Sequence, residues 1–353
     1  MDSQYSERQV ERHSRPTTHD LAKAAGVSRA TVDRVLNGRA KVKQETVDRV
    51  NLAIEQLGFV RNLAAANLAK GTYYRFLFVL PQSGDLFLDE ILERIEEANH
   101  AFASEMIWAE VQHIDENDPH GIAAFLSALS KDSIDGVAIM APESPQLRDS
   151  VTRLKERGIE VLPFISNQNF DQDGGWVGID NIAAGATAAT LLGRFCRADR
   201  GTVLLVSETI QSRDSLERRF GFDDIINTEF PYLRPLPTLE TYGSQERAQE
   251  IIATTVANNP DIVGVYVLSS EARAPLEALF EQPLRHKPTV IAHERTEYTE
   301  RELSCGNLDA VITQDPGHLV RSAIRKLRAG VDGRETLASQ ERIRVEILIK
   351  QNL

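Results

Sequence analysis

Residues 20–38 read DLAKAAGVSRATVDRVLNG, and this stretch decides the fold of the N-terminal part of the chain. Its apolar residues recur at helical spacing on both sides of Gly26. Glycine readily adopts a positive φ, so Gly26 predicts a tight turn between two short helices. Thr18 is placed to cap the first helix, and Ser28 is placed to cap the second helix over 29–37. The stretch therefore predicts a helix, a turn and a helix.

The second of these helices is expected to expose cations. Its valines and leucine must face a core, because they share one side of the helix. The residues left on the outer side are Arg29, Ala30, Asp33 and Arg34. Arginines near the start of an exposed helix can reach the edges of bases in DNA. Apolar residues at helical spacing after position 43 predict a third helix that ends at Gly58.

Charge is distributed unevenly along the 353 residues, of which 42% are hydrophobic and 26% are charged, as expected for two or three folded domains. Residues 15–70 contain ten Lys and Arg against five Asp and Glu, a net charge of +5, whereas the whole chain carries −12. The other 297 residues therefore carry −17. A basic head on an acidic body indicates that only the head contacts a polyanion. Residues 1–15 are polar without an apolar period and are expected to form a flexible tail.

The opening stretch, followed by ETVDRVNLAIEQLGFVRNLAAANLAKG at 45–71, resembles the DNA-binding head of the LacI/GalR family of bacterial transcription regulators. The resemblance implies a helix-turn-helix domain over 16–61 that binds operator DNA, in which the residues matching Arg29 and Ala30 read bases in the major groove. The DNA-binding residues that it implies are Thr18, Ser28, Arg29, Ala30, Thr31, Arg34, Asn37, Lys41, Asn62 and Leu68. Asp33 departs from the small hydroxyl residue that is usual in the family. Its carboxylate would repel phosphate or accept from a cytosine amine, so the operator sequence stays open.

Residues 62–71 are rich in alanine but number fewer than the ~12 residues that an isolated helix needs in water. They resemble the hinge helix of the family, which forms when two subunits lie side by side on DNA. The leucine that matches Leu68 is then wedged into the minor groove. This resemblance implies a homodimer or a larger symmetric oligomer. A plain alanine-rich linker is the alternative.

From residue 72 onward, short apolar runs alternate with amphipathic helices. This order predicts an α/β fold with parallel sheets covered on both faces. A body of about 280 residues is too long for one sheet, which indicates two similar lobes. The expected strands are 76–80, 107–114, 136–140, 161–165, 203–206, 263–268, 289–292 and 310–313. The expected helices include 87–102, 118–129, 146–157, 182–196 and 245–257.

The body also resembles the effector-binding core of the same family, which has the two-lobed, parallel-sheet fold of type I periplasmic sugar-binding proteins. The resemblance implies one lobe of about 72–166 with 295–330, and a second lobe of about 167–294 with the C-terminal segment. The segments on which it rests are 177–185 (VGIDNIAAG), 217–222 (ERRFGF), 288–294 (PTVIAHE) and 309–316 (DAVITQDP). All four are expected at the carboxyl ends of strands, where open α/β sheets bind ligands.

A sugar or polyol effector needs planar side chains that make paired hydrogen bonds, together with an apolar ring. By resemblance, Arg218 matches the effector arginine of the family, and Gln314 matches an amide that holds sugar hydroxyls in ribose-type binding proteins. The other candidate effector-binding residues are Asp85, Phe87, Asn167, Arg213, Asp214, Arg273 and Glu294. Residues 269–273 (SSEAR) depart from the glycine- or asparagine-containing pattern expected there, so the identity of the effector stays open.

Other classes of protein are disfavoured. No run approaches the ~18 apolar residues of a membrane helix, and the start lacks the apolar core of a secretory signal, so a cytoplasmic protein is expected. Cys196 and Cys305 cannot build a disulfide framework or a four-thiolate zinc site, and neither a metal nor a cofactor is expected. No phosphate-binding glycine motif or nucleophile elbow follows an expected strand, so enzyme activity is not expected.

We therefore expect a transcription regulator, more specifically a repressor, whose affinity for operator DNA is controlled by a small sugar or polyol. The alternative from another class is a sugar-binding receptor of a transport system, which the body alone would favour. An enzyme that has retained a helix-turn-helix is a third possibility. Residues do not indicate whether the effector releases DNA or strengthens its binding.

Overall fold

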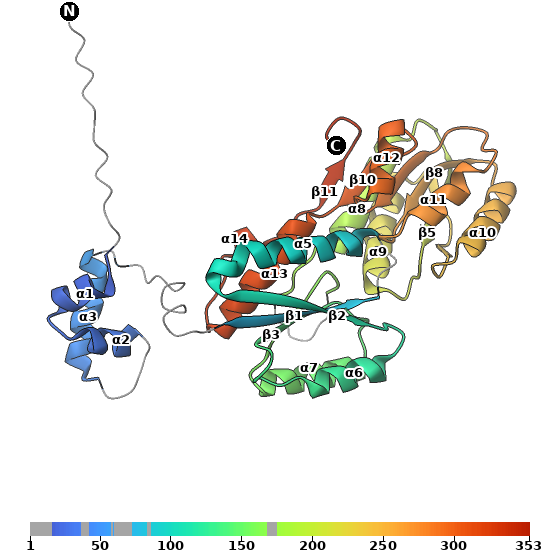
Figure 1. Ribbon diagram of the computed structural model, residues 1–353. Coiled ribbons are helices and arrows are strands. Elements are labelled where there is room, and N and C mark those ends of the chain that lie inside the picture. Colours follow the sequence, from blue (N-terminus) through green and yellow to red (C-terminus); the bar gives the residue numbers. More distant parts are fainter. Residues whose placement is uncertain (1–15, 37–41, 58, 60–72, 83–85, 168–174) are drawn as a thin grey trace, which may run out of the picture. The chain divides into compact units, whose positions relative to one another are not determined.

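The computed structural model describes residues 16–36, 42–57, 59, 73–82, 86–167 and 175–353. The chain divides between Thr72 and Tyr73 into a small helical unit and a larger α/β unit (Figure 1). The expected tail, 1–15, and the expected hinge, 62–71, lie outside the described residues. Within the described ranges, no helix combines the length and the apolar character needed to cross a membrane.

The small unit contains the three predicted helices, α1 (Thr18–Ala25), α2 (Arg29–Leu36) and α3 (Gln44–Leu57). Gly26 ends α1 in the left-handed conformation, with φ 63°, which confirms the predicted turn. The cap of α1 is Thr17 and not Thr18 as predicted. The Thr17 hydroxyl accepts a hydrogen bond from the Asp20 backbone N–H, and the Asp20 carboxylate accepts one from the Thr17 backbone N–H. This reciprocal arrangement satisfies two backbone donors at the helix start.

The first lobe of the large unit is a four-stranded parallel sheet in the order β2-β1-β3-β4. Its strands are β1 (Tyr74–Pro81), β2 (Ile107–Ile114), β3 (Gly136–Ile139) and β4 (Glu160–Pro163). Its helices are α5 (Leu86–Phe102), η1 (Ala103–Glu105), α6 (Pro119–Ala128) and α7 (Pro145–Glu156). Phe76 and Phe78 pack towards α5 and α13 (Pro316–Val331), whereas Leu77 and Val79 pack towards α6 and α7. Figure 1 shows these two pairs of helices on opposite faces of the sheet. Because successive side chains of a strand point to opposite faces of the sheet, β1 contributes to an apolar core on each face.

The second lobe is a seven-stranded sheet in the order β11-β10-β9-β8-β5-β6, with β7 paired to β5. Its strands are β5 (Gly201–Ser207), β6 (Leu233–Pro235), β7 (Leu239–Glu240), β8 (Ile262–Val267), β9 (Thr289–His293), β10 (Ala310–Thr313) and β11 (Glu346–Leu348). Its helices are α8 (Asn181–Phe195), α9 (Arg213–Glu229), α10 (Gln245–Asn258), α11 (Arg273–Phe280) and α12 (Glu297–Cys305). The short helix α14 (Ala338–Glu341) lies beside α13, to which Arg325 joins it through Glu341. Helices α8 and α9 pack on one face, and α10, α11 and α12 pack on the other.

The eight predicted strands are present, although β6, β7 and β11 escaped prediction because two or three residues carry too little periodicity. The predicted lobe boundaries are wrong for 295–313. Strand β10 pairs in parallel with β9, so this segment belongs to the second lobe, and the chain returns to the first lobe only with α13. Val177 forms a parallel bridge with Phe164 beside β4, so the second lobe begins after Val177 and not at 167.

Helices α8 and α9 approach each other through two glycines. A Cβ atom on Gly185 would lie 1.9 Å from the carbonyl oxygen of Arg218, and one on Gly221 would lie 2.0 Å from the carbonyl oxygen of Ile182. Both clashes are with backbone atoms, which cannot move aside as a flexible side chain can. The close crossing therefore requires glycine at both positions and sets the place of Arg218 beside α8.

We expect Gly185→Ala to lower the free energy of unfolding by about 2 kcal/mol or more, since overpacking costs ~1–3 kcal/mol and here the obstacle is backbone. Ala183→Ser, on the exposed side of the same helix, should change it by less than about 0.5 kcal/mol. Urea denaturation followed by circular dichroism measures both variants. Equal stability of the wild type and Gly185→Ala would contradict the close crossing.

Candidate functional site

Helix α2 has one buried side and one exposed side. Val32 is fully buried, Thr31 is half-buried, and Arg29, Ala30 and Arg34 are exposed. Two guanidinium groups on the free side of a short helix can donate paired hydrogen bonds to bases in a major groove. The exposure expected for this helix from its apolar pattern is therefore confirmed.

The turn before α2 is held by side chains from two helices. Ser28 Oγ accepts a hydrogen bond from the Thr31 backbone N–H at 3.1 Å. Arg49 of α3 donates to the carbonyl oxygens of Ala25 and Gly26. Sequence reasoning counted Arg49 only as a positive charge and missed this structural role. The other predicted DNA contacts are Thr18, which is half-buried, and Asn37, Lys41, Asn62 and Leu68, which lie outside the described residues.

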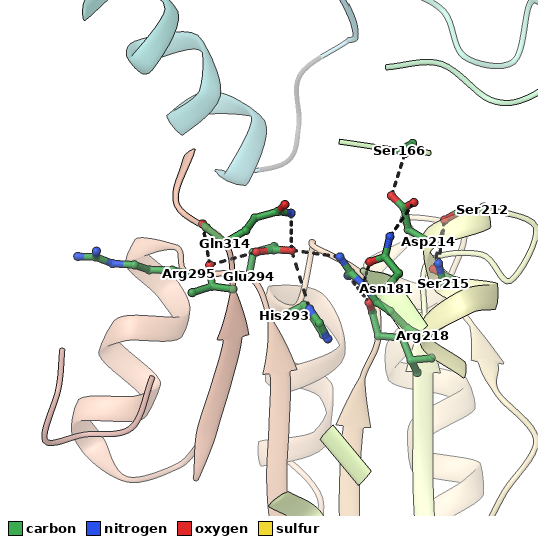
Figure 2. A network of polar contacts seen from close by, with 12 residues as sticks. Ser166, Asn181, Ser212, Asp214, Ser215, Arg218, His293, Glu294, Arg295 and Gln314 are labelled. Carbon is green, nitrogen blue, oxygen red and sulfur yellow. Dashed lines mark hydrogen bonds and ion pairs between the residues drawn. The ribbon is translucent and has the colours of Figure 1, made fainter. Parts of the chain in front are cut away.

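In the large unit, a buried polar network lies above the carboxyl ends of the strands of the second lobe (Figure 2). Arg218 of α9 lies at its centre with a side chain that is 5% exposed. Its Nε donates to Asn181 Oδ1 at 2.8 Å, and its Nη1 donates to the carbonyl oxygen of Leu268 at 2.7 Å. Its Nη2 donates to Glu294 Oε1 at 3.1 Å. The guanidinium group thus makes hydrogen bonds within the protein through each of its three nitrogens.

Glu294, directly after β9, is fully buried and shares its two oxygens among several donors. Thr313 Oγ1 donates to Oε2 at 3.1 Å, and Gln314 Nε2 donates to Oε1 at 3.2 Å. Burial opposes the ionisation of Glu294, but the neighbouring His293, the positive charge of Arg218 and the hydrogen bond from Thr313 outweigh burial and lower its pKa below the ordinary value. The carboxylate is therefore ionised and can only accept hydrogen bonds.

Gln314 follows β10 and is 2% exposed. Because Glu294 only accepts, the Gln314 amide nitrogen must face it, and the amide oxygen must face away. Among the described residues, that oxygen, Oε1, has no hydrogen-bond partner. An unpaired buried acceptor costs about 1–3 kcal/mol, so Gln314 is suited to a ligand that brings a donor.

Polar bonds at the same strand ends join the two lobes. Ser166, after β4 in the first lobe, donates to Asp214 Oδ2 of α9 at 2.8 Å (Figure 2). Arg213, also on α9, donates to Glu143 Oε2 of the first lobe at 3.3 Å and to Glu217 Oε1 at 2.7 Å. Burial raises the pKa of Asp214 above its ordinary value. Helix α9 thus supplies both the central arginine and the contacts between lobes.

The backbone next to this crossing is strained. Ile165 has φ 62°, a left-handed conformation that β-branched residues rarely adopt. Its backbone N–H donates to the carbonyl oxygen of Val177 at 2.7 Å, which holds the turn. Strain of this kind is common at functional sites, and the next residue, Ser166, contacts the second lobe through Asp214.

The remaining predicted effector residues lie in different places. Phe87 is 2% exposed and belongs to the apolar core beneath α5. Arg273 is exposed at the start of α11, and no hydrogen bond seen among the described residues joins it to the network. Asn167 is half-buried at the crossing between lobes, and Asp85 lies outside the described residues. The structure therefore brings together Asp214, Arg218, Glu294 and Gln314, and places Arg213 beside them at the contact between the lobes.

Two corrections concern the residues around Arg218. Segment 217–222 lies within α9 and not at a strand-to-helix junction, because the helix already begins at Arg213. Sequence reasoning also missed Asn181 and Thr313 as partners in the network. Asn181 and Thr313 lie in segments 177–185 and 309–316, which the sequence placed at strand ends, so that expectation could have identified both residues.

His293 is a buried neighbour of the network. Its Nε2 lies 2.8 Å from the Tyr266 hydroxyl, and its Nδ1, which is 3.9 Å from Glu294 Oε1, has no hydrogen-bond partner among the described residues. Burial, with the charge of Arg218 nearby, lowers the pKa of His293 to about 4, so the ring is neutral at pH 7. In the part of the chain that the structure describes, no three His, Cys, Asp or Glu side chains cluster as a metal site.

We expect the free energy of unfolding to fall as the pH drops from 7 to 5. The pKa of His293 changes from its ordinary 6.5 to about 4 on folding, so in this range the unfolded chain binds a proton that the folded protein does not. His293 alone should account for a loss of roughly 2 kcal/mol. His293→Asn should therefore show a weaker pH dependence in urea denaturation. The exposed His286→Asn is the control, and an unchanged slope in His293→Asn would contradict the assignment.

Two parts of the chain match known families. Residues 17–62 match the bacterial regulatory proteins of the lacI family, and residues 76–335 match a periplasmic binding protein domain. The maltose regulon regulatory protein MalI of Escherichia coli is 30% identical over 250 residues, 70% of each chain. The HTH-type transcriptional regulator GntR of Pseudomonas aeruginosa is 26% identical over 278 residues, 75% of each chain.

Solved structures share the fold of the body. A putative LacI transcriptional regulator from Bacteroides fragilis has a TM-score of 0.68 at 21% identity and covers 80% of this chain and 98% of its own. An ABC transporter periplasmic solute binding protein from Actinobacillus succinogenes, with bound D-allose, has a TM-score of 0.70 at 15% identity, covering 79% and 98%. With the matches of head and body to the two families, these relatives show that the chain belongs to the LacI family of bacterial regulatory proteins and is a DNA-binding transcription regulator.

Proposed function

We propose that the protein is a repressor whose operator affinity is set by a small sugar or polyol bound at Arg218, Glu294 and Gln314. The observation that supports this most directly is the buried Gln314 oxygen, which has no hydrogen-bond partner among the described residues and lies at strand ends, where open α/β sheets bind ligands. A hydroxyl group supplies the missing donor. The D-allose complex of a solute binding protein with the same fold also favours a sugar. The lesser candidates for this site are Asp85, Phe87, Asn167, Arg213, Asp214 and Arg273.

The effector would act by shifting the population of lobe arrangements. The bonds from Ser166 to Asp214 and from Arg213 to Glu143 cross between the lobes, so a ligand beside them changes which arrangement is favoured. That change would reach DNA through the hinge, 62–71, which precedes the body. The effector is an inducer or a corepressor according to which arrangement it binds more tightly.

Two copies would act together on DNA, as a homodimer or a larger symmetric oligomer. One small helical head buries little surface on DNA, so a pair of heads is needed for tight and specific binding. Arg29, Ala30 and Arg34 would contact bases, and Leu68 of a hinge that folds on DNA would enter the minor groove. The remaining contacts in this proposal are Thr18, Ser28, Thr31, Asn37, Lys41 and Asn62.

A receptor of a transport system is the second candidate, and the likeness of the body to solute binding proteins favours it. The match of 17–62 to the lacI family argues against a transport receptor, because the function of such a receptor does not require a DNA-binding helix. The relatives are named as regulators and not as enzymes. We therefore propose a regulator without catalytic activity that works beside its DNA in the cytoplasm.

Specificity should depend on Arg29. Arg29→Ala should lose about 1–3 kcal/mol of binding free energy and relax the preference at one base position, because a guanidinium group contacts base edges there. Lys41→Ala should instead weaken binding to all sequences alike, since a phosphate contact carries no sequence information. Selection from a randomised operator library measures both effects. Identical preferences of the wild type and Arg29→Ala would rule out the assignment.

Effector affinity should depend on Gln314. Gln314→Ala should weaken binding of the sugar found by screening about 10- to 100-fold, because a ligand hydroxyl loses its buried partner. Operator affinity without effector should stay near the wild-type value. The exposed Gln340→Ala is the matched control. Titration calorimetry gives the affinities, and unaltered binding by Gln314→Ala would place the effector elsewhere.

A further inference from the structure

Three arginines at the strand ends of the second lobe are already paired with carboxylates, whereas Arg273 is exposed at the start of α11 and no hydrogen bond seen among the described residues joins it to the network. Arg218 bonds to Glu294, and Arg213 bonds to Glu143 and Glu217. Arg295, which directly follows Glu294, pairs with Glu300. The buried Arg218 is therefore not left to neutralise a negative charge on a ligand, because its partner Glu294 is buried beside it. An anion that entered beside Arg218 would also meet the ionised Glu294 at close range.

The polar network lacks a hydrogen-bond donor for one buried oxygen and does not lack an anion. Gln314 Oε1 is buried and has no partner among the described residues, whereas Gln314 Nε2 is held by Glu294. A phosphate or carboxylate group has oxygens that accept hydrogen bonds, so it would leave this oxygen unpaired. A hydroxyl group donates a hydrogen bond and brings no charge.

We propose that the effector is uncharged where it reaches Arg218 and Gln314, so that a neutral sugar or polyol binds and a sugar phosphate or sugar acid is rejected there. This inference rests on the proposed function of the site and adds the charge of its ligand. Glu294 is then the residue that excludes anions, because it occupies the guanidinium group that an anion would need. Removing the charge of Glu294 should open the site to anions.

The test uses malonate, a small dicarboxylate, with the full-length protein. Thermal unfolding is followed in malonate and in sodium chloride of equal ionic strength, for the wild type and Glu294→Gln. The wild type should show the same Tm in both salts. Glu294→Gln should gain about 3 °C in malonate at roughly ten times its Kd, since a ligand that binds the folded state raises Tm.

Two variants make the test specific. Glu300→Gln makes the same charge change beside the exposed Arg295 and should show no gain in malonate. The double variant Arg218→Gln, Glu294→Gln should show no increase in Tm in malonate, because it lacks the guanidinium group that the single variant Glu294→Gln leaves unpaired. A gain in the wild type as large as in Glu294→Gln, or no gain in Glu294→Gln, would overturn the proposal.

If Glu294→Gln does not fold, titration calorimetry of the wild type decides. Absence of malonate binding up to about 10 mM supports the proposal, and binding with a Kd below about 1 mM overturns it. The proposed function fails separately, if no neutral sugar changes operator affinity. The malonate result does not depend on that outcome, so the two failures can be distinguished.

Discussion

The buried charge of Arg218 is the constraint on which the second lobe depends. A guanidinium group stays ionised inside a protein, so each of its donors must meet an acceptor there. Those acceptors come from α8, from the residue after β8 and from Glu294 after β9. Gly185 and Gly221 let α9 approach α8 closely enough to deliver the side chain. The hydrogen bonds that one buried guanidinium group requires therefore constrain how two helices and two strand ends pack together.

The same ion pair links the proposed ligand site to the crossing between lobes. Glu294 is shared by Arg218 and Gln314, and Gln314 stands where the chain leaves β10 for α13 in the first lobe. Asp214, one helical turn before Arg218, accepts a hydrogen bond from Ser166 of the first lobe. The proposed binding residues and the contacts between lobes are thus neighbouring side chains. A ligand that moves one group must disturb the others, which is the physical basis for coupling.

The head is stabilised by different interactions from those that stabilise the body. Its core is small, and it is held together by a glycine turn, a capping box and the bonds from Arg49 to the turn. Its net positive charge attracts DNA through a term that does not depend on sequence, while the negative charge of the rest keeps the body away from phosphate. This separation of charge would let one chain bind a polyanion with its head and the proposed small neutral ligand with its body.

Sequence alone determined the features that depend on neighbouring residues. The turn at Gly26, the exposed side of α2, the eight longer strands and the places of Glu294 and Gln314 after strands follow from glycine conformation and apolar period, which act over a few residues. Only the tertiary structure decided that Arg218 pairs with Glu294, 76 residues away, and that 295–313 joins the second sheet. The spacing of residues along the chain does not indicate which buried charges pair with each other. The apolar pattern of a strand also does not indicate which sheet the strand joins, because that depends on its hydrogen bonds to a neighbouring strand.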